Sequence, residues 1–128
     1  MIILLDTSTP VCKLTLMDGS NRVEDSWQAD RGLAKGLLKY LHEKLLFQGK
    51  DWSDIQAIGV FKGPGSFTGL RIGLTVANTI ADAQNIPIVG SDNDDWQSDV
   101  LNKIKNGDND QIVLPRYGSD AHITKPIK

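Results

Sequence analysis

The sequence has little cysteine, no long apolar run and no block of one charge, and each shortage excludes a class of protein. The 128 residues include a single cysteine, Cys12, so no disulfide can form within the chain. No apolar run approaches the roughly 20 residues of a membrane span. The apolar start ends at Asp6 and no basic residue precedes it, unlike a signal peptide. We therefore expect a cytoplasmic protein that makes no membrane contact.

The charge balance does not favour direct binding of nucleic acid. The chain carries 14 Lys and Arg against 16 Asp and Glu, a formal net charge of −2. The cations are scattered, and the sequence shows no basic stripe that would neutralise several phosphates. We expect nucleic acid to meet this chain only through another protein.

The hydrophobic pattern predicts strands and helices in a definite order. Strands are expected at 2–5, 11–17, 22–28, 55–61 and 86–90, with a weaker one at 111–114. Helices are expected at 30–48, where Asp30 is the predicted N-cap, and at 68–85 and 96–105. Short turns join the first three strands, whereas the later strand–helix–strand order requires a parallel crossover. The pattern predicts an α/β fold with a mixed five-stranded sheet.

The helix expected at 68–85 is apolar around most of its circumference. Between Gly69 and Ala83 its only charged residues are Arg71 and Asp82. Such a helix must be covered on more than one side. Small residues every fourth position also form a stripe that permits a close approach: Gly69, Gly73, Ala77 and Ala81. Two interpretations remain open, since the first helix of this chain or a separate subunit would fill the stripe.

We take the separate subunit as the working hypothesis. The partner interface would combine the outer side of this helix with the apolar side of the first helix. Its predicted residues are Leu37, Leu41, Gly69, Leu70, Ile72, Gly73, Leu74, Val76, Ala77 and Ile80.

Two loops resemble phosphate-binding loops in part. An acid followed by hydroxyls, at residues 6–9, is suited to magnesium and a phosphate, but is also common in plain turns. The glycine-rich turn at 62–69 lacks the third glycine of a dinucleotide fingerprint and the Gly-Lys-Ser/Thr ending of a P-loop. A tight strand-to-helix turn is the preferred interpretation. No metal site is expected, and Cys12 is interpreted as a buried structural thiol.

The segment Gly63-Pro64-Gly65-Ser66-Phe67-Thr68-Gly69-Leu70-Arg71-Ile72-Gly73 closely resembles the signature of the TsaB family, formerly called YeaZ. We take Gly63, Pro64, Gly65, Ser66, Phe67, Thr68 and Arg71 as the signature loop. The first strand with Asp6-Thr7-Ser8-Thr9, and the strand at 86–90, are also similar to that family. The match is strong over 1–90 and faint beyond.

The resemblance implies a ribonuclease-H-like, actin-like (ASKHA) half-domain at 1–91, with 92–128 as a short extension in place of the usual second domain. It also implies a non-catalytic partner subunit. Family members bind TsaD, the transferase that adds threonylcarbamoyl to a tRNA adenosine, and pair through their two N-terminal helices. A TsaE-type ATPase is a further implied partner.

Departures from the family pattern bear on nucleotide binding. Active relatives have a glycine after the first acid, where this chain has Thr7-Ser8-Thr9. Members of the family often have a histidine early in the first helix, whereas this chain has none between Asp30 and Gly36. Residues Asp6 to Thr9 are therefore interpreted as a vestigial nucleotide site, and no cofactor is expected. Two alternatives stay open: a stand-alone homodimeric regulator of the same fold, and a nucleotide-binding ASKHA enzyme.

Overall fold

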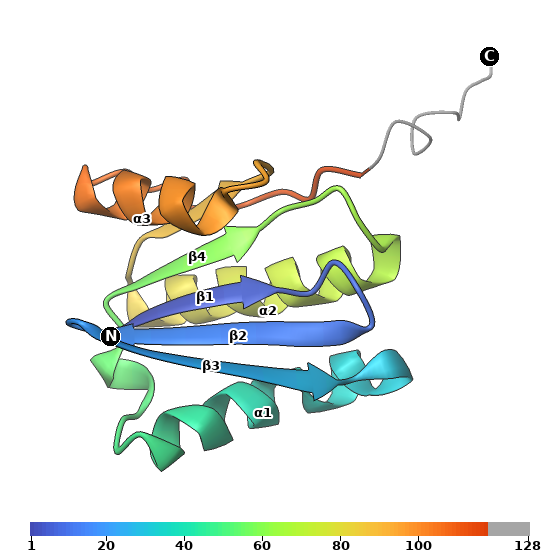
Figure 1. Ribbon diagram of the computed structural model, residues 1–128, viewed down its shortest axis with the longest axis horizontal. Helices are drawn as coiled ribbons and strands as arrows, with labels where there is room; N and C mark the ends of the chain where they lie inside the picture. Colours follow the sequence, from blue (N-terminus) through green and yellow to red (C-terminus); the bar gives the residue numbers. More distant parts are fainter. Residues whose placement is uncertain (118–128) are drawn as a thin grey trace.

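The computed structural model describes residues 1–117 and contains one sheet with helices on both faces (Figure 1). The strands are β1 (Ile2–Asp6), β2 (Val11–Asp18), β3 (Asn21–Gln28), β4 (Ala57–Phe61) and β5 (Ile88–Ser91). The helices are α1 (Leu33–Phe47), α2 (Phe67–Gln84) and α3 (Trp96–Lys105), with short 3-10 helices η1 (Asp30–Gly32) and η2 (Trp52–Asp54). The strand order is β3-β2-β1-β4-β5. β1, β2 and β3 are antiparallel neighbours, and β4 and β5 run parallel to β1. The predicted mixed five-stranded sheet is confirmed.

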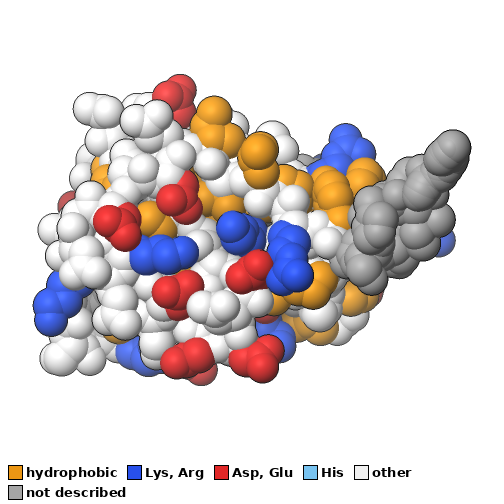
Figure 2. Space-filling view, turned by 90° about the horizontal axis from the view of Figure 1, so that it is seen from above, with side chains coloured by type: hydrophobic (Ala, Val, Ile, Leu, Met, Phe, Trp, Pro, Cys, Tyr) orange, Lys and Arg blue, Asp and Glu red, His pale blue; other side chains and the backbone are white. Residues whose placement is uncertain are grey.

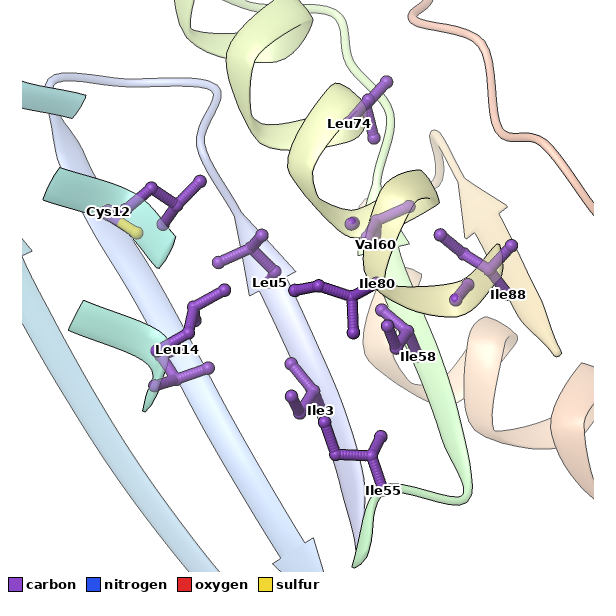
Figure 3. Packing of buried hydrophobic residues seen from close by; sticks show 14 of the residues in the cluster. Ile3, Leu5, Cys12, Leu14, Ile55, Ile58, Val60, Leu74, Ile80 and Ile88 are labelled. Carbon is purple, nitrogen blue, oxygen red and sulfur yellow. The ribbon is translucent and has the colours of Figure 1, made fainter. Parts of the chain in front are cut away.

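Helices α1 and α2 cover one face of the sheet and enclose the larger core. Successive strand residues point to opposite faces, so Ile3 and Leu5 of β1 face these helices while Leu4 faces away. Figure 3 shows Leu74 and Ile80 of α2 packed among the strand side chains of this core. Leu37 and Leu41 of α1 complete it and are fully buried.

Helix α3 covers the other face, over β4 and β5. Val100 packs against Leu4 and Val89, and all three are fully buried. Gly59 of β4 permits this approach, because a Cβ there would lie 2.6 Å from Val100 Cγ2. The helix predicted at 96–105 is confirmed at the same bounds. The domain boundary at residue 91 stays a prediction, but α3 shares the sheet of the first 91 residues.

The strand predicted at 111–114 is wrong, and the outer edge of β5 explains why. Its N–H groups donate to side chains: Ile88 N to Asn109 Oδ1 at 3.1 Å, and Gly90 N to Asp110 Oδ2 at 2.9 Å. Its carbonyls accept hydrogen bonds: the Ile88 carbonyl from Asp110 N at 2.8 Å, and the Gly90 carbonyl from Lys103 Nζ at 2.9 Å. These groups close the edge to a further strand.

The N-terminus of the first helix also differs from the prediction. Asp30 does not act as its N-cap, since α1 begins at Leu33 and its N-cap, Gly32, makes no side-chain cap bond. Asp30 lies in η1 with φ of 47°, and its carboxylate accepts from Gln28 Nε2 at 2.8 Å. Within residues 1–117, no helix has the length and apolarity to cross a membrane.

The packing of α3 gives the first prediction. Val100→Ala removes two buried methyl groups that contact the sheet, and we expect the free energy of unfolding to fall by about 1–3 kcal/mol. Urea unfolding followed by circular dichroism measures the change. Asn102→Ala, an exposed position on the same helix, is the control and should be near neutral. Equal stability of the two variants would show that α3 does not support the sheet.

Candidate functional site

The loop after β1 and the N-terminus of α2 are joined in one structure. Thr7 Oγ1 donates to the Gly69 carbonyl at 2.8 Å, and Ser66 N donates to the Ser8 carbonyl at 2.8 Å. Ser66 also caps α2, because its Oγ accepts from Gly69 N at 3.2 Å. The two sequence motifs at 6–9 and 63–73 therefore form a single interlock, which we define as the contact of Thr7 and Ser8 with residues 65–73.

The spacing of the signature glycines follows from this interlock. A Cβ at Gly65 would lie 2.5 Å from Ser8 Cβ. A Cβ at Gly69 would overlap the Thr7 carbonyl oxygen, and one at Gly73 would overlap the Thr7 side chain. Gly69 and Gly73 are the first two positions of the small stripe, and there both interpretations of what fills the stripe are wrong. Neither the first helix nor a second subunit fills it there, since Thr7 of this chain does.

The segment after residue 111 also packs against α2 and the signature loop. Val113 exchanges two hydrogen bonds with the Asn78 side chain of α2, each 2.9 Å long. Arg116 N donates to the Lys62 carbonyl at 2.6 Å, and a Cβ at Gly63, where φ is 118°, would overlap the Arg116 carbonyl. The Tyr117 ring lies against the Phe67 ring, with the ring centroids 4.4 Å apart and the ring planes tilted by 30°. The predicted irregular tail is therefore packed on the signature loop as far as residue 117, and its remainder, 118–128, lies outside the described residues.

The predicted vestigial nucleotide site serves this interlock. Asp6 Oδ1 accepts from Ser8 N at 2.9 Å and from Ser8 Oγ at 2.6 Å. The Thr7 side chain is buried, and Thr9 Oγ1 donates to the Val11 carbonyl at 3.1 Å. These polar groups already have partners within the chain. Among residues 1–117, no cluster of three His, Cys, Asp or Glu has the geometry of a metal site.

Most of the predicted interface residues lie inside the molecule, which corrects that prediction. The buried ones are Leu37, Leu41, Gly69, Leu70, Gly73, Leu74, Ala77 and Ile80. The sheet, α1, the loop after β1 and the segment around Val113 together cover α2 on more sides than the sequence suggested. Only Ile72 and Val76 of the predicted set reach the surface, where they are half-buried.

These two residues line an open groove between α1 and α2. The groove has a volume of about 410 Å³ and is lined by Ala34, Thr68, Arg71, Ile72, Thr75 and Val76. Thr68 and Ile72 also line a neighbouring hollow of about 620 Å³ that reaches Pro10 and Arg31. Leu38, one turn beyond Ala34 on α1, is 55% exposed. Sequence reasoning missed Ala34, Leu38 and Thr75, although the i, i+4 spacing of Ala34 and Leu38 places both on one helix face.

The single cysteine is poorly suited to act as a nucleophile. Burial raises the pKa of the Cys12 thiol to about 12, and the nearby Asp6 and Asp25 carboxylates add to the rise. The thiolate, which is the reactive form, is therefore scarce at neutral pH. The interpretation of Cys12 as a buried structural residue is confirmed.

The sheet order, the crossovers and the interlock define an α/β protein of the ASKHA-like class. Comparison with known proteins gives the family. The family model described as "TsaD: tRNA N6-adenosine threonylcarbamoyltransferase" matches residues 28–93, just over half of the chain.

Individual relatives and solved structures show which members of the family this chain is similar to. The tRNA threonylcarbamoyladenosine biosynthesis protein TsaB of Haemophilus influenzae is 31% identical over 88 residues, which are 69% of this chain and 37% of that protein. The TsaB protein of Escherichia coli is 30% identical over 89 residues, which are 70% of this chain and 38% of that one. The structure of YeaZ from Pseudomonas aeruginosa matches with a TM-score of 0.66 and 31% identity, over 70% of this chain and 42% of that one. The chain belongs to the TsaB (YeaZ) family and spans less than half the length of these relatives.

The interlock gives a prediction about Gly73. Gly73→Ala should lower the free energy of unfolding by about 1–3 kcal/mol, because the new methyl group meets Thr7, even though alanine favours helix by about 1 kcal/mol. Thr7→Gly combined with Gly73→Ala should recover part of this loss, giving a favourable coupling energy in a double-mutant cycle from urea unfolding. Gly32→Ala, where a Cβ meets nothing within 4 Å, is the control. Additive losses would show that Thr7 does not fill the stripe.

The thiol gives a second prediction for this region. At pH 8 the folded protein should react with iodoacetamide on the order of 1,000-fold more slowly than a free thiol, because a pKa near 12 leaves little thiolate. Mass spectrometry follows the modification over time, and the urea-unfolded protein, which exposes the thiol, is the control. Rapid labelling of the folded protein would contradict the burial of Cys12.

Proposed function

We propose that this chain is a non-catalytic partner subunit in tRNA threonylcarbamoyladenosine biosynthesis. In this role it binds and supports a TsaD-type threonylcarbamoyl transferase. Its relatives carry the name of that pathway, and the family model that it matches is described as the transferase. The observation that carries the proposal is the open groove between α1 and α2, which residues 1–117 leave uncovered.

The groove has the character of a protein interface. Its floor is formed by Ile72 and Val76, and its walls carry small side chains, Ala34 and Thr75. Small side chains on two neighbouring helices let a facing helix approach closely, so that its larger side chains fill the groove. Leu38 extends the apolar surface by one turn of α1. Burial of this surface against a partner would supply the favourable free energy of association, at about 25 cal/mol per Å² before the costs of binding.

A partner role without catalysis fits the chemistry of the described residues. The Cys12 thiol is buried, and Asp6, Thr7 and Ser8 are engaged with each other or with α2. A nucleotide that used the side chains of Asp6, Thr7 or Ser8 as ligands would have to compete with these hydrogen bonds. We therefore expect weak nucleotide binding by the isolated chain.

The test fills the groove without changing its charge. The double variant Ala34→Gln with Thr75→Gln places two longer polar side chains where a partner helix would lie. Both positions are exposed, and glutamine is a good helix former, so the fold should be retained. We expect the affinity for the TsaD-type transferase of the same organism to fall about 10- to 100-fold, as overpacking predicts. Isothermal titration calorimetry measures the affinity, and threonylcarbamoylation of tRNA by the mixture should fall with it.

Ser98→Gln introduces the same residue at an exposed position of α3, on the opposite face of the sheet, and serves as the matched control. It should bind like the wild type. A wild-type chain that binds no transferase would refute the partner role. A groove variant that binds as tightly as the control would place the interface elsewhere.

A further inference from the structure

The sheet has two outer edges, and they differ in how the chain covers them. At the β5 edge, Lys103, Asn109 and Asp110 form hydrogen bonds with the backbone groups of the strand. At the opposite edge, β3 pairs with β2 alone, and no other strand among residues 1–117 lies against its outer side (Figure 1). An open strand edge presents N–H and C=O groups that can pair with a further strand.

The β2–β3 hairpin determines which residues of β3 direct these groups outward. Asp18 and Asn21 flank a two-residue turn, and in such hairpins the flanking residues form the hydrogen-bonded kind of pair. Just beyond the other end of the ladder, Ala29 N donates to the Pro10 carbonyl at 3.1 Å, which gives the same phase. Because the two kinds of pair alternate along an antiparallel ladder, residues 22, 24, 26 and 28 direct their N–H and C=O groups away from β2.

The first half of β3 is exposed on both sides of the sheet. Residues 21–24 are all exposed. On the α1 side, Val23 is 38% exposed and Phe47 is 86% exposed, and both line a small hollow of about 100 Å³. On the other side, Arg22 Nε lies 2.8 Å from Glu24 Oε2. The edge therefore presents apolar side chains on one side and two charges of opposite sign on the other.

We propose that two copies of this chain pair through β3, antiparallel about a two-fold axis at Val23. In this register, Arg22 of each copy lies opposite Glu24 of the other. Both residues direct their backbone groups outward, so each such pair exchanges two main-chain hydrogen bonds. Val23 of one copy meets Val23 of the other on the α1 side, beside the exposed Phe47. This inference does not depend on the proposed partner role.

Charge selects this register over its neighbours. Outward-directed residues must pair with each other, so the two-fold axis passes through a residue pair and not between two pairs. An axis at Arg22, Glu24 or Asp25 would place that residue opposite its own copy, and like charges directly opposite one another are destabilising. An axis at Ser26 would carry Arg22 past the end of the other strand. Only the axis at Val23 brings opposite charges together.

The same charges favour a second copy over an unrelated strand as the occupant. Charged side chains on an edge strand usually oppose pairing. Here the two charges differ in sign and lie two residues apart, so the pattern is complementary to itself when a second copy runs antiparallel. A two-fold contact uses the same patch on both copies and therefore satisfies both charges of each copy.

The edge is separate from the groove between α1 and α2. Phe47 follows Ala34 by 13 residues on α1, which corresponds to about 20 Å along the helix axis. Pairing through β3 therefore leaves the groove of each copy open.

A pair of charge reversals tests the proposal. Sedimentation equilibrium of the wild-type chain at about 10–300 μM should show a monomer–dimer equilibrium with a Kd on the order of 10–100 μM, because a short strand contact belongs to the weak class of interfaces. Arg22→Glu alone and Glu24→Arg alone each place like charges opposite one another, so the Kd should rise at least about 10-fold. An equimolar mixture of the two variants restores opposite charges at both positions and should associate at least as tightly as the wild type.

Two controls accompany these variants. Arg22 also forms a hydrogen bond with Gln97 of α3, so circular dichroism checks that each variant is folded. Lys105→Glu reverses a charge at an exposed position of α3, on the side of the molecule where acidic and basic side chains lie side by side (Figure 2). This variant should associate like the wild type.

Three results would overturn the proposal. The first is a wild-type chain that remains monomeric at about 300 μM, well above the expected Kd. The second is a dimer that both single reversals leave intact, or that the mixture fails to restore. The third is a dimer that Ala34→Gln with Thr75→Gln abolishes, because the contact would then lie on α1 and α2 rather than on β3.

Discussion

The contact between Thr7 and the N-terminal half of α2 determines how the rest of the molecule is arranged. Thr7 lies against the backbone of Gly69 and the open side of Gly73, and its hydroxyl donates to the Gly69 carbonyl at 2.8 Å. A side chain larger than hydrogen at either glycine would move α2 away from the end of β1. With α2 fixed in this way, its apolar side chains meet the sheet, and its outer side remains beside α1 to form the groove.

This contact also marks the limit of what the sequence predicted. Elements that a local pattern determines were predicted within a residue or so, such as β1 from its continuous apolar run and α3 from the inward side chains Val100, Leu101 and Ile104. The glycine stripe was recognised as a site of close approach, but its occupant was not. A contact between residues 7 and 73 depends on where the chain folds back, and no periodicity in either segment encodes that pairing. The same reason explains the failure at 111–114, where Asn109 and Asp110 take the place of a sixth strand at the edge of β5.

The predicted interface failed for a related reason. An apolar helix in a small domain suggested an external partner, because the chain offers little material to cover it. The structure covers α2 with four separate parts of the same chain, among them the loop after β1 and the segment held by Asn78. What remains for a partner is a groove with small walls rather than a large apolar face. Ala34 and Thr75, which shape it, carry no strong sequence signal because neither is markedly apolar.

A groove of this kind changes what must supply specificity. A large apolar face associates with many partners, since the hydrophobic effect has no direction. The apolar part of this groove is limited to residues such as Ile72, Val76 and the exposed Leu38, so its burial alone distinguishes poorly between one helical surface and another. Shape therefore has to contribute to any discrimination, through the small side chains that line the groove. The internal use of the glycine stripe therefore limits the surface that is left: because the fold itself covers most of the apolar side chains of α2, only the half-buried Ile72 and Val76 remain between the small side chains of Ala34 and Thr75.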